Sequence, residues 1–420
     1  MSTHATVTEL LRAGLAALER HNEDEARARF VEARETERRA AGGRSAGGIL
    51  AGGTLPGGDH SGGAFSDSAR PGDSAPELFA QVSDPDALYF AALATGQLGE
   101  NPLGLARRAV EAYRAAPPSL RAARAWETYG YFLHDGGGDA AAAQAMREAA
   151  GVYAALGGHE AQQANALYNA GISYAEAGDL TAAIAALEAA LLPAGALPEV
   201  DLGRVAIRAT LAAARLDAGQ FAAAARDYRA AEAAFAALPG QEFNAIDCAF
   251  GRARAVLGSG DYPAAAAHFA EVAARATELA GGEPAAERAD AAGVPEPSTT
   301  ATEAELAAWE VAAMSWHHVA VAQAKNGAPA QGVPAMRTAA AIYAGLGEEL
   351  SAAHCRGLLG DLHAEARDMI AARTAWQAAI ATLDAAAAQA AAHGGELPAG
   401  PARDLEEFRR KLRAAGGALA

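Results

Sequence analysis

The 420-residue chain has few of the residues on which several common functions depend. It contains only 2 cysteines and two lysines, Lys325 and Lys411. Acidic residues outnumber basic ones by 51 to 34, which leaves a net charge of −17. A surface of that sign repels nucleic acid, because binding requires lysine and arginine to neutralise the phosphates. We therefore expect no direct binding to nucleic acid.

Segments that would direct the chain to a membrane are also lacking. No run of roughly 18 or more large apolar residues occurs, as a membrane-spanning helix would need. The N-terminus does not combine a basic region with an apolar core of roughly 7–15 residues, as a secretory signal does. We expect no membrane association and a cytoplasmic location.

Motifs for catalysis, cofactors and metals are missing too. The chain has no Gly-x-Gly-x-x-Gly, no Gly-x-x-x-x-Gly-Lys-[Ser/Thr] and no His-Glu-x-x-His. His317 and His318 are adjacent, but neighbours on a helix point about 100° apart and do not easily share an ion. Cys248 and Cys355 each precede a small residue by five positions, which favours a packing role. We expect no enzymatic activity, no cofactor and no metal site.

What the chain does contain is a recurring pattern of helix, turn and helix. Alignment on one alanine of the second helix gives Ala143, Ala183, Ala224 and Ala265, spaced by 40, 41 and 41 residues. Further copies are centred near 316–339 and 360–379, and a weaker one covers 88–115. The clearest copy consists of Tyr168, Gly171, Tyr174, Gly178, Asp179, Leu180, Ala183, Leu187 and Ala190.

This pattern resembles the tetratricopeptide repeat, in which a small residue marks helix A, Gly-Asp marks the turn, and Ala-aromatic-Ala marks helix B. The resemblance implies an all-α solenoid of antiparallel helix pairs in a right-handed superhelix. The family period is about 34 residues, so these repeats are longer. Their length is similar to that of the long-helix variants in bacterial peptide-sensing regulators and motor adaptor chains.

Breaks in the pattern suggest a domain organisation. Residues 5–36 read as an N-terminal helix pair, and residues 41–83 as a flexible glycine-rich linker. The solenoid is expected over 84–393, with an insertion rich in glycine and proline at 281–300. Residues 401–415 have one apolar face and read as the C-terminal capping helix.

The resemblance also implies a role in binding a protein or a peptide, because helix A lines the concave face in this family. Asn169 has a second interpretation, as a structural residue of the repeat. A peptide-sensing regulator is the first alternative function and an enzyme hidden in the fold is the second, while the oligomeric state stays open. The groove residues implied are Asn165, Tyr168, Asn169, Phe250, Arg254, His317, Lys325, His354 and Asp361.

Overall fold

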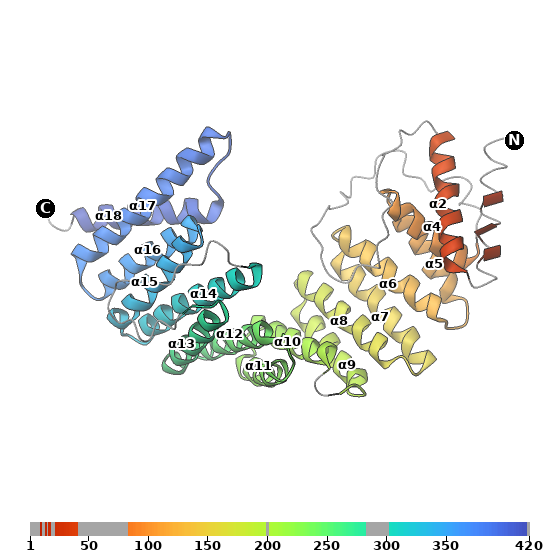
Figure 1. The fold of residues 1–420 in the computed structure, drawn as a ribbon, viewed down its shortest axis with the longest axis horizontal. Helices are drawn as coiled ribbons and strands as arrows, with labels where there is room; N and C mark the ends of the chain where they lie inside the picture. Colours follow the sequence, from red (N-terminus) through yellow and green to blue (C-terminus); the bar gives the residue numbers. More distant parts are fainter. Residues whose placement is uncertain are drawn as a thin grey trace. The chain divides into compact units, whose positions relative to one another are not determined.

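The computed structural model describes a chain built from helices (Figure 1). Two compact units divide it, residues 1–198 and residues 199–420. Within the part that the structure describes no residue lies in a β-strand, which confirms the predicted all-α fold. The described residues are 9, 10, 13, 14, 16, 17, 22–40, 83–198, 201–282 and 302–417.

The first unit consists of helix α2 (Glu23–Ala40) followed by a series of helix pairs. Phe30 of α2 is fully buried, and its ring stacks on Phe90 of α4 with the centroids 6.1 Å apart. This contact joins the N-terminal segment to the first pair. The pairs are α4 (Pro85–Gln97) with α5 (Leu103–Arg114), α6 (Leu120–Asp135) with α7 (Asp139–Leu156), and α8 (Glu160–Glu176) with α9 (Leu180–Ala194).

The second unit continues the same arrangement and ends in a single helix, α18 (Ala399–Gly417). Consecutive helices pack on one another throughout this unit. The pairs are α10 (Leu202–Asp217) with α11 (Phe221–Ala236), α12 (Glu242–Gly258) with α13 (Tyr262–Leu279), α14 (Glu303–Lys325) with α15 (Pro329–Gly345), and α16 (Glu349–Glu365) with α17 (Met369–Ala392).

Local turn chemistry sets where these helices begin. The side chain of Asp84 accepts a hydrogen bond from the Ala87 N–H at 2.8 Å, and Pro85 follows at the first helical position. Thr302 and Glu305 form both halves of a capping box at the start of α14. These two helix starts confirm what the sequence predicted.

A repeated interlock between small and large residues holds each pair together. Gly171 of α8 faces Leu187 of α9, and a Cβ added at Gly171 would lie 2.5 Å from Leu187 Cγ. Gly130 faces Met146 in the same way, and the ring of Trp376 covers Gly360. The large residue always follows the small one by 16 positions and is buried. This interlock, present in both units, confirms the tetratricopeptide-like repeat.

Helix α18 covers the end of the second unit. Leu405 and Phe408 are buried among residues of α16 and α17. The Phe408 ring lies directly on Gly357, so closely that a Cβ there would overlap it. Because the last pair of a repeat array has no following pair to bury its apolar face, such a helix is needed to shield it.

Several predicted segments fall outside the described residues. These are almost all of the predicted linker at 41–83, almost all of the insertion at 281–300, and most of the first helix of the pair at 5–36. The domain boundaries drawn from them stay predictions. No described helix is both long and apolar enough to cross a membrane.

Both cysteines are buried in the second unit. Cys248 and Cys355 are free thiols, each 2 % exposed. Burial raises the pKa of each thiol to about 12. They are therefore packed, protonated side chains, as their register before a small residue predicts.

Candidate binding surface

The predicted groove residues belong to two separate sets. Asn165, Tyr168 and Asn169 lie on α8 of the first unit. The other six lie on α12, α14 and α16 of the second unit. All of them are on helix A of a repeat, as the resemblance implies.

In the first unit, the α8 set is partly used by the fold itself. Asn165 is exposed, whereas Tyr168 and Asn169 are half-buried. The Asn169 amide donates to the Tyr131 hydroxyl of α6 at 3.0 Å. This bond links the A helices of two neighbouring repeats. It supports the interpretation of Asn169 as a structural residue.

Phe250, expected as an exposed anchor, is a core residue. Its side chain is 8 % exposed and packs edge-on against Phe269, with ring centroids 5.6 Å apart. The His318 ring covers another side at 5.4 Å. A partner cannot reach this ring without displacing its neighbours, which corrects the sequence-based role.

His354 and Asp361 are occupied by the capping helix. His354 Nδ1 lies 2.6 Å from Asp404 Oδ2. Asp361 accepts from Trp376 Nε1 at 3.0 Å through one oxygen and from Lys411 Nζ at 2.7 Å through the other. His354 thus holds α18 to α16, and Asp361 holds both α17 and α18 to α16. Asp361 is used by the fold, whereas the His354 side chain stays 43% exposed and its role in the groove stays a prediction.

His317 is a mostly buried, neutral side chain. Burial lowers its pKa to about 4, and the neighbouring His318 and His354 lower it further. Its Nε2 atom is buried and has no hydrogen-bond partner among the described residues. His318 is also neutral near pH 7, because burial lowers its pKa while its Nδ1 donates to the Met314 carbonyl at 2.8 Å. These rings contribute shape to the surface and no positive charge.

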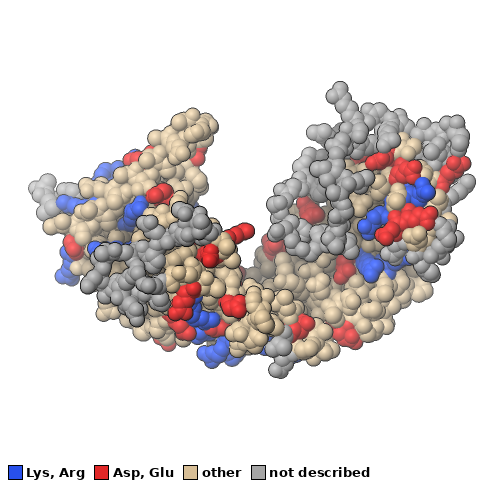
Figure 2. All heavy atoms as spheres, viewed as in Figure 1, with Lys and Arg blue, Asp and Glu red and all other residues tan. Residues whose placement is uncertain are grey.

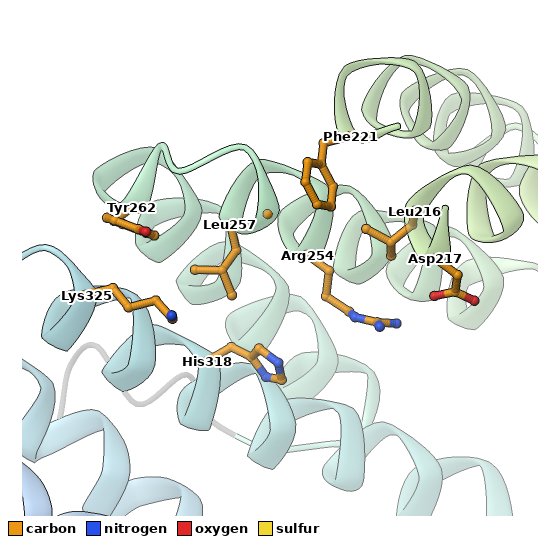
Figure 3. A pocket seen from close by; sticks show the side chains of 9 residues that line it. Leu216, Asp217, Phe221, Arg254, Leu257, Tyr262, His318 and Lys325 are labelled. Carbon is orange, nitrogen blue, oxygen red and sulfur yellow. The ribbon is translucent and has the colours of Figure 1, made fainter. Parts of the chain in front are cut away.

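Arg254 and Lys325 are the predicted residues that the structure brings together in a recess. They come from α12 and α14 and enter one pocket of about 410 Å³. Figure 3 shows Lys325 and Arg254 on opposite sides of Leu257, with the Arg254 guanidinium extending toward Asp217 and the His318 ring below them. The full lining is Leu216, Asp217, Phe221, Arg254, Leu257, Gly258, Tyr262, His318 and Lys325.

The two cations in this pocket form no close ion pair, although the charge of Arg254 opposes the rise that burial causes in the pKa of Asp247 on the same helix. Arg254 and Lys325 are exposed, and neither forms an ion pair or hydrogen bond with another described residue. Asp217 supplies the one acidic group of the lining. The lining side chains thus carry one excess positive charge, in a chain whose net charge is −17. On the face drawn in Figure 2, described basic residues occur singly or in small groups among acidic ones, without a broad basic patch.

Apolar side chains form the rest of the pocket. The Phe221 ring lies against Gly258, where an added Cβ would overlap it. Leu216 is 8 % exposed, and Leu257 and Tyr262 are half-buried. Phe221 and Tyr262 were not predicted as site residues, because they follow Gly219-Gln220 and Gly260-Asp261 and belong to the turn signal of the repeat. Their aromatic character after each turn was the available signal.

Comparisons with known proteins return similar structures but no similar sequence. No family model matches, and no curated protein matches. RapI in its apo form has 12% identity and a TM-score of 0.47, over 97% of this chain and 86% of that one. A putative kinesin light chain with TPR-like repeats from Podospora anserina has 18% identity and a TM-score of 0.41, over 53% of this chain and 94% of that one. A tetratricopeptide repeat protein from Parabacteroides merdae has 13% identity and a TM-score of 0.39, over 77% and 98%.

Every one of these TM-scores is below 0.5. The tetratricopeptide-like architecture is accordingly assigned from the chain's own helix pairs and their interlocking residues. Function is argued from the pocket, since a fold does not determine what a protein binds.

Proposed function

We propose that the chain is a protein- or peptide-binding scaffold whose second unit binds its partner at the Arg254–Lys325 pocket. The observation that carries the proposal is the pair of exposed, unpaired cations on adjacent A helices beside an apolar recess. A fold that leaves two cations unpaired in an acidic chain provides a place for an anionic group. Fully satisfied charges elsewhere, such as Asp361 with Lys411, do not.

The chemistry of the pocket defines the segment it fits. A carboxylate of an aspartate, a glutamate or a chain terminus suits the guanidinium and ammonium donors. An apolar side chain next to that carboxylate suits Leu216, Phe221 and Leu257. A volume of 410 Å³ is close to the lower end of the usual range for ligand pockets, about 300–1,000 Å³, and accommodates one or two side chains. The proposed ligand is therefore a short acidic-apolar segment of a partner protein.

Affinity capture with matched variants tests this proposal. The full chain and an Arg254→Ala/Lys325→Ala double variant are used in parallel on the native lysate, and proteins retained by only the first are identified by mass spectrometry. Calorimetry then compares Arg254→Ala and Lys325→Ala with Arg226→Ala, an exposed arginine on helix B. A true anchor is expected to cost at least about 2 kcal/mol, or roughly thirtyfold in affinity.

Arg226→Ala is expected to bind like the unmodified chain. If Arg254→Ala and Lys325→Ala bind the captured partner as tightly as Arg226→Ala does, the partner uses another surface and the proposal is wrong. Higher salt provides a second readout, because an exposed charge contact weakens as screening increases.

A peptide-sensing regulator remains the alternative, and it uses the same pocket. The two functions differ in what binding does to the rest of the chain. A scaffold changes hydrogen exchange only in the helices that line the pocket, α10 to α14, whereas a sensor also changes it in helices that the peptide does not touch. Exchange measured with and without the identified segment separates them.

A further inference from the structure

Three side chains of the first unit bring metal-ligating atoms together at one point on its surface. His134 is in the last turn of α6, Asp139 is the first residue of α7, and Glu176 is the last residue of α8. One ligand atom from each lies within 4.8 Å of the other two. No other group of three such side chains meets this condition among the described residues.

The sequence of the α6–α7 turn makes this arrangement possible. In the turn between α8 and α9, Asp179 occupies the N-cap position and its carboxylate accepts from the Ala182 N–H. In the α6–α7 turn, Gly138 occupies the cap position and the aspartate comes one residue later. Asp139 therefore does not cap its helix, and its carboxylate lies next to the His134 ring.

The His134 ring lies within reach of both carboxylates, one at hydrogen-bond distance and the other at a separation close to that of metal ligands. His134 Nδ1 lies 2.8 Å from Asp139 Oδ1 and 3.4 Å from Glu176 Oε2. Ligand atoms around a tetrahedral zinc ion, with bonds of about 2.0–2.1 Å, are separated by about 3.3 Å. Both carboxylates approach the same ring nitrogen, so an ion can take the place of its proton with small side-chain rotations.

We propose that His134, Asp139 and Glu176 bind one divalent transition-metal ion, with zinc as the representative. An imidazole with two carboxylates favours this class over calcium and magnesium, which prefer all-oxygen ligand sets. The side chains are 38%, 25% and 46% exposed, so the ion reaches them from solvent. Three protein ligands leave a further position for water. Since α6 and α8 belong to successive repeats, the ion also links those repeats.

The test uses the full chain without a histidine tag. Zinc binding is measured by calorimetry, and cobalt substitution gives a visible spectrum that reports the coordination geometry. One ion is expected to bind per chain and to raise the unfolding temperature, because it binds the folded state preferentially. His134→Ala, Asp139→Asn and Glu176→Gln are each expected to weaken zinc binding at least tenfold.

The chain contains a matched control in His363. Its Nδ1 lies 3.8 Å from Asp368, five residues later, as Asp139 follows His134, but it lacks a third ligand among the described residues. His363→Ala is expected to leave zinc affinity unchanged. The proposal is overturned if the chain shows no saturable zinc binding, or if His363→Ala weakens it as much as His134→Ala. Circular dichroism of each variant without zinc checks that it is folded, so that a loss of zinc affinity is not caused by unfolding.

Discussion

Buried histidines make the stability of the second unit depend on pH. The pKa of His317 falls from an ordinary 6.5 to about 4, chiefly because the ring is buried and secondarily because His318 and His354 are close. The unfolded chain therefore binds a proton at a higher pH than the folded chain does. Stability is full above the unfolded pKa and decreases as the pH falls from 6.5 towards 4.

This leads to a prediction for His317→Leu. Between about pH 7.5 and about pH 5, the unmodified chain is expected to lose up to about 2 kcal/mol of stability through this one residue. The variant should lose that much less over the same interval, as measured by urea unfolding at both pH values. His393→Leu, at an exposed position, is the control. Identical pH dependence in the variant and the unmodified chain would contradict the assignment.

A second prediction at the residue scale contrasts two glycines of the first unit. Gly171→Ala is expected to lower stability, because overpacking against buried Leu187 costs about 1–3 kcal/mol and exceeds the gain of about 1 kcal/mol from replacing a helical glycine. Gly151→Ala is expected to raise stability by about 0.5–1 kcal/mol, because nothing lies within 4 Å of its added Cβ. Thermal and urea unfolding of both variants provide the check. If both variants changed the free energy of unfolding equally, helix propensity alone would account for the effect of either substitution.

At the scale of single elements, Phe408 is the largest apolar contact of the capping helix α18, beside Leu405 and two polar contacts to α16. Phe408 is 2 % exposed and fills the space above Gly357. Phe408→Ala is expected to cost about 3–5 kcal/mol, since it removes a buried ring and leaves a cavity in the core. Exposed Arg413→Ala on the same helix should change little. Urea unfolding measures both, and a small cost for Phe408→Ala would mean that α18 is held by its ion pairs.

Elements were predictable from the sequence where their signals are local. The helix starts at Asp84 and Thr302 depend on groups three residues apart, so the sequence shows the whole interaction. Gly171 and Leu187 are both positions of the recurring motif within one repeat, although their contact was not itself predicted. Residues that recur at fixed separations can be recognised from the sequence alone.

The binding surface was less predictable because its contacts lie far apart in the chain. His354 and Asp361 each meet a residue of α18 that is 50 positions away, and nothing in the repeat pattern indicates this. Phe250 is covered by His318, across an insertion whose length hides the register. Arg254 and Lys325, both predicted groove residues, line the same pocket, and their role in binding stays a prediction. Phe221 and Tyr262 also line it but were not predicted as site residues.

At the scale of the whole molecule, stability is expected to be divided among neighbouring repeats. Helices pack mainly on the helices next to them in the chain, and the two units form separate compact bodies. In such arrays stability is approximately a sum of repeat terms and nearest-neighbour interfaces. A local defect should therefore lower protection nearby and leave distant repeats unchanged, unlike in a two-state globular domain.

Hydrogen exchange of Gly171→Ala and Phe408→Ala tests this expectation within one chain. Gly171→Ala should reduce protection of amides in α8 and α9 and leave α16 and α17 as they are, because the altered packing is confined to one pair. Phe408→Ala should do the reverse, since its ring packs on α16. Arg413→Ala is the matched control for the second variant. If either defect lowered protection equally in all helices, unfolding would be cooperative across both units, and an ion or peptide bound in one would stabilise the other as well.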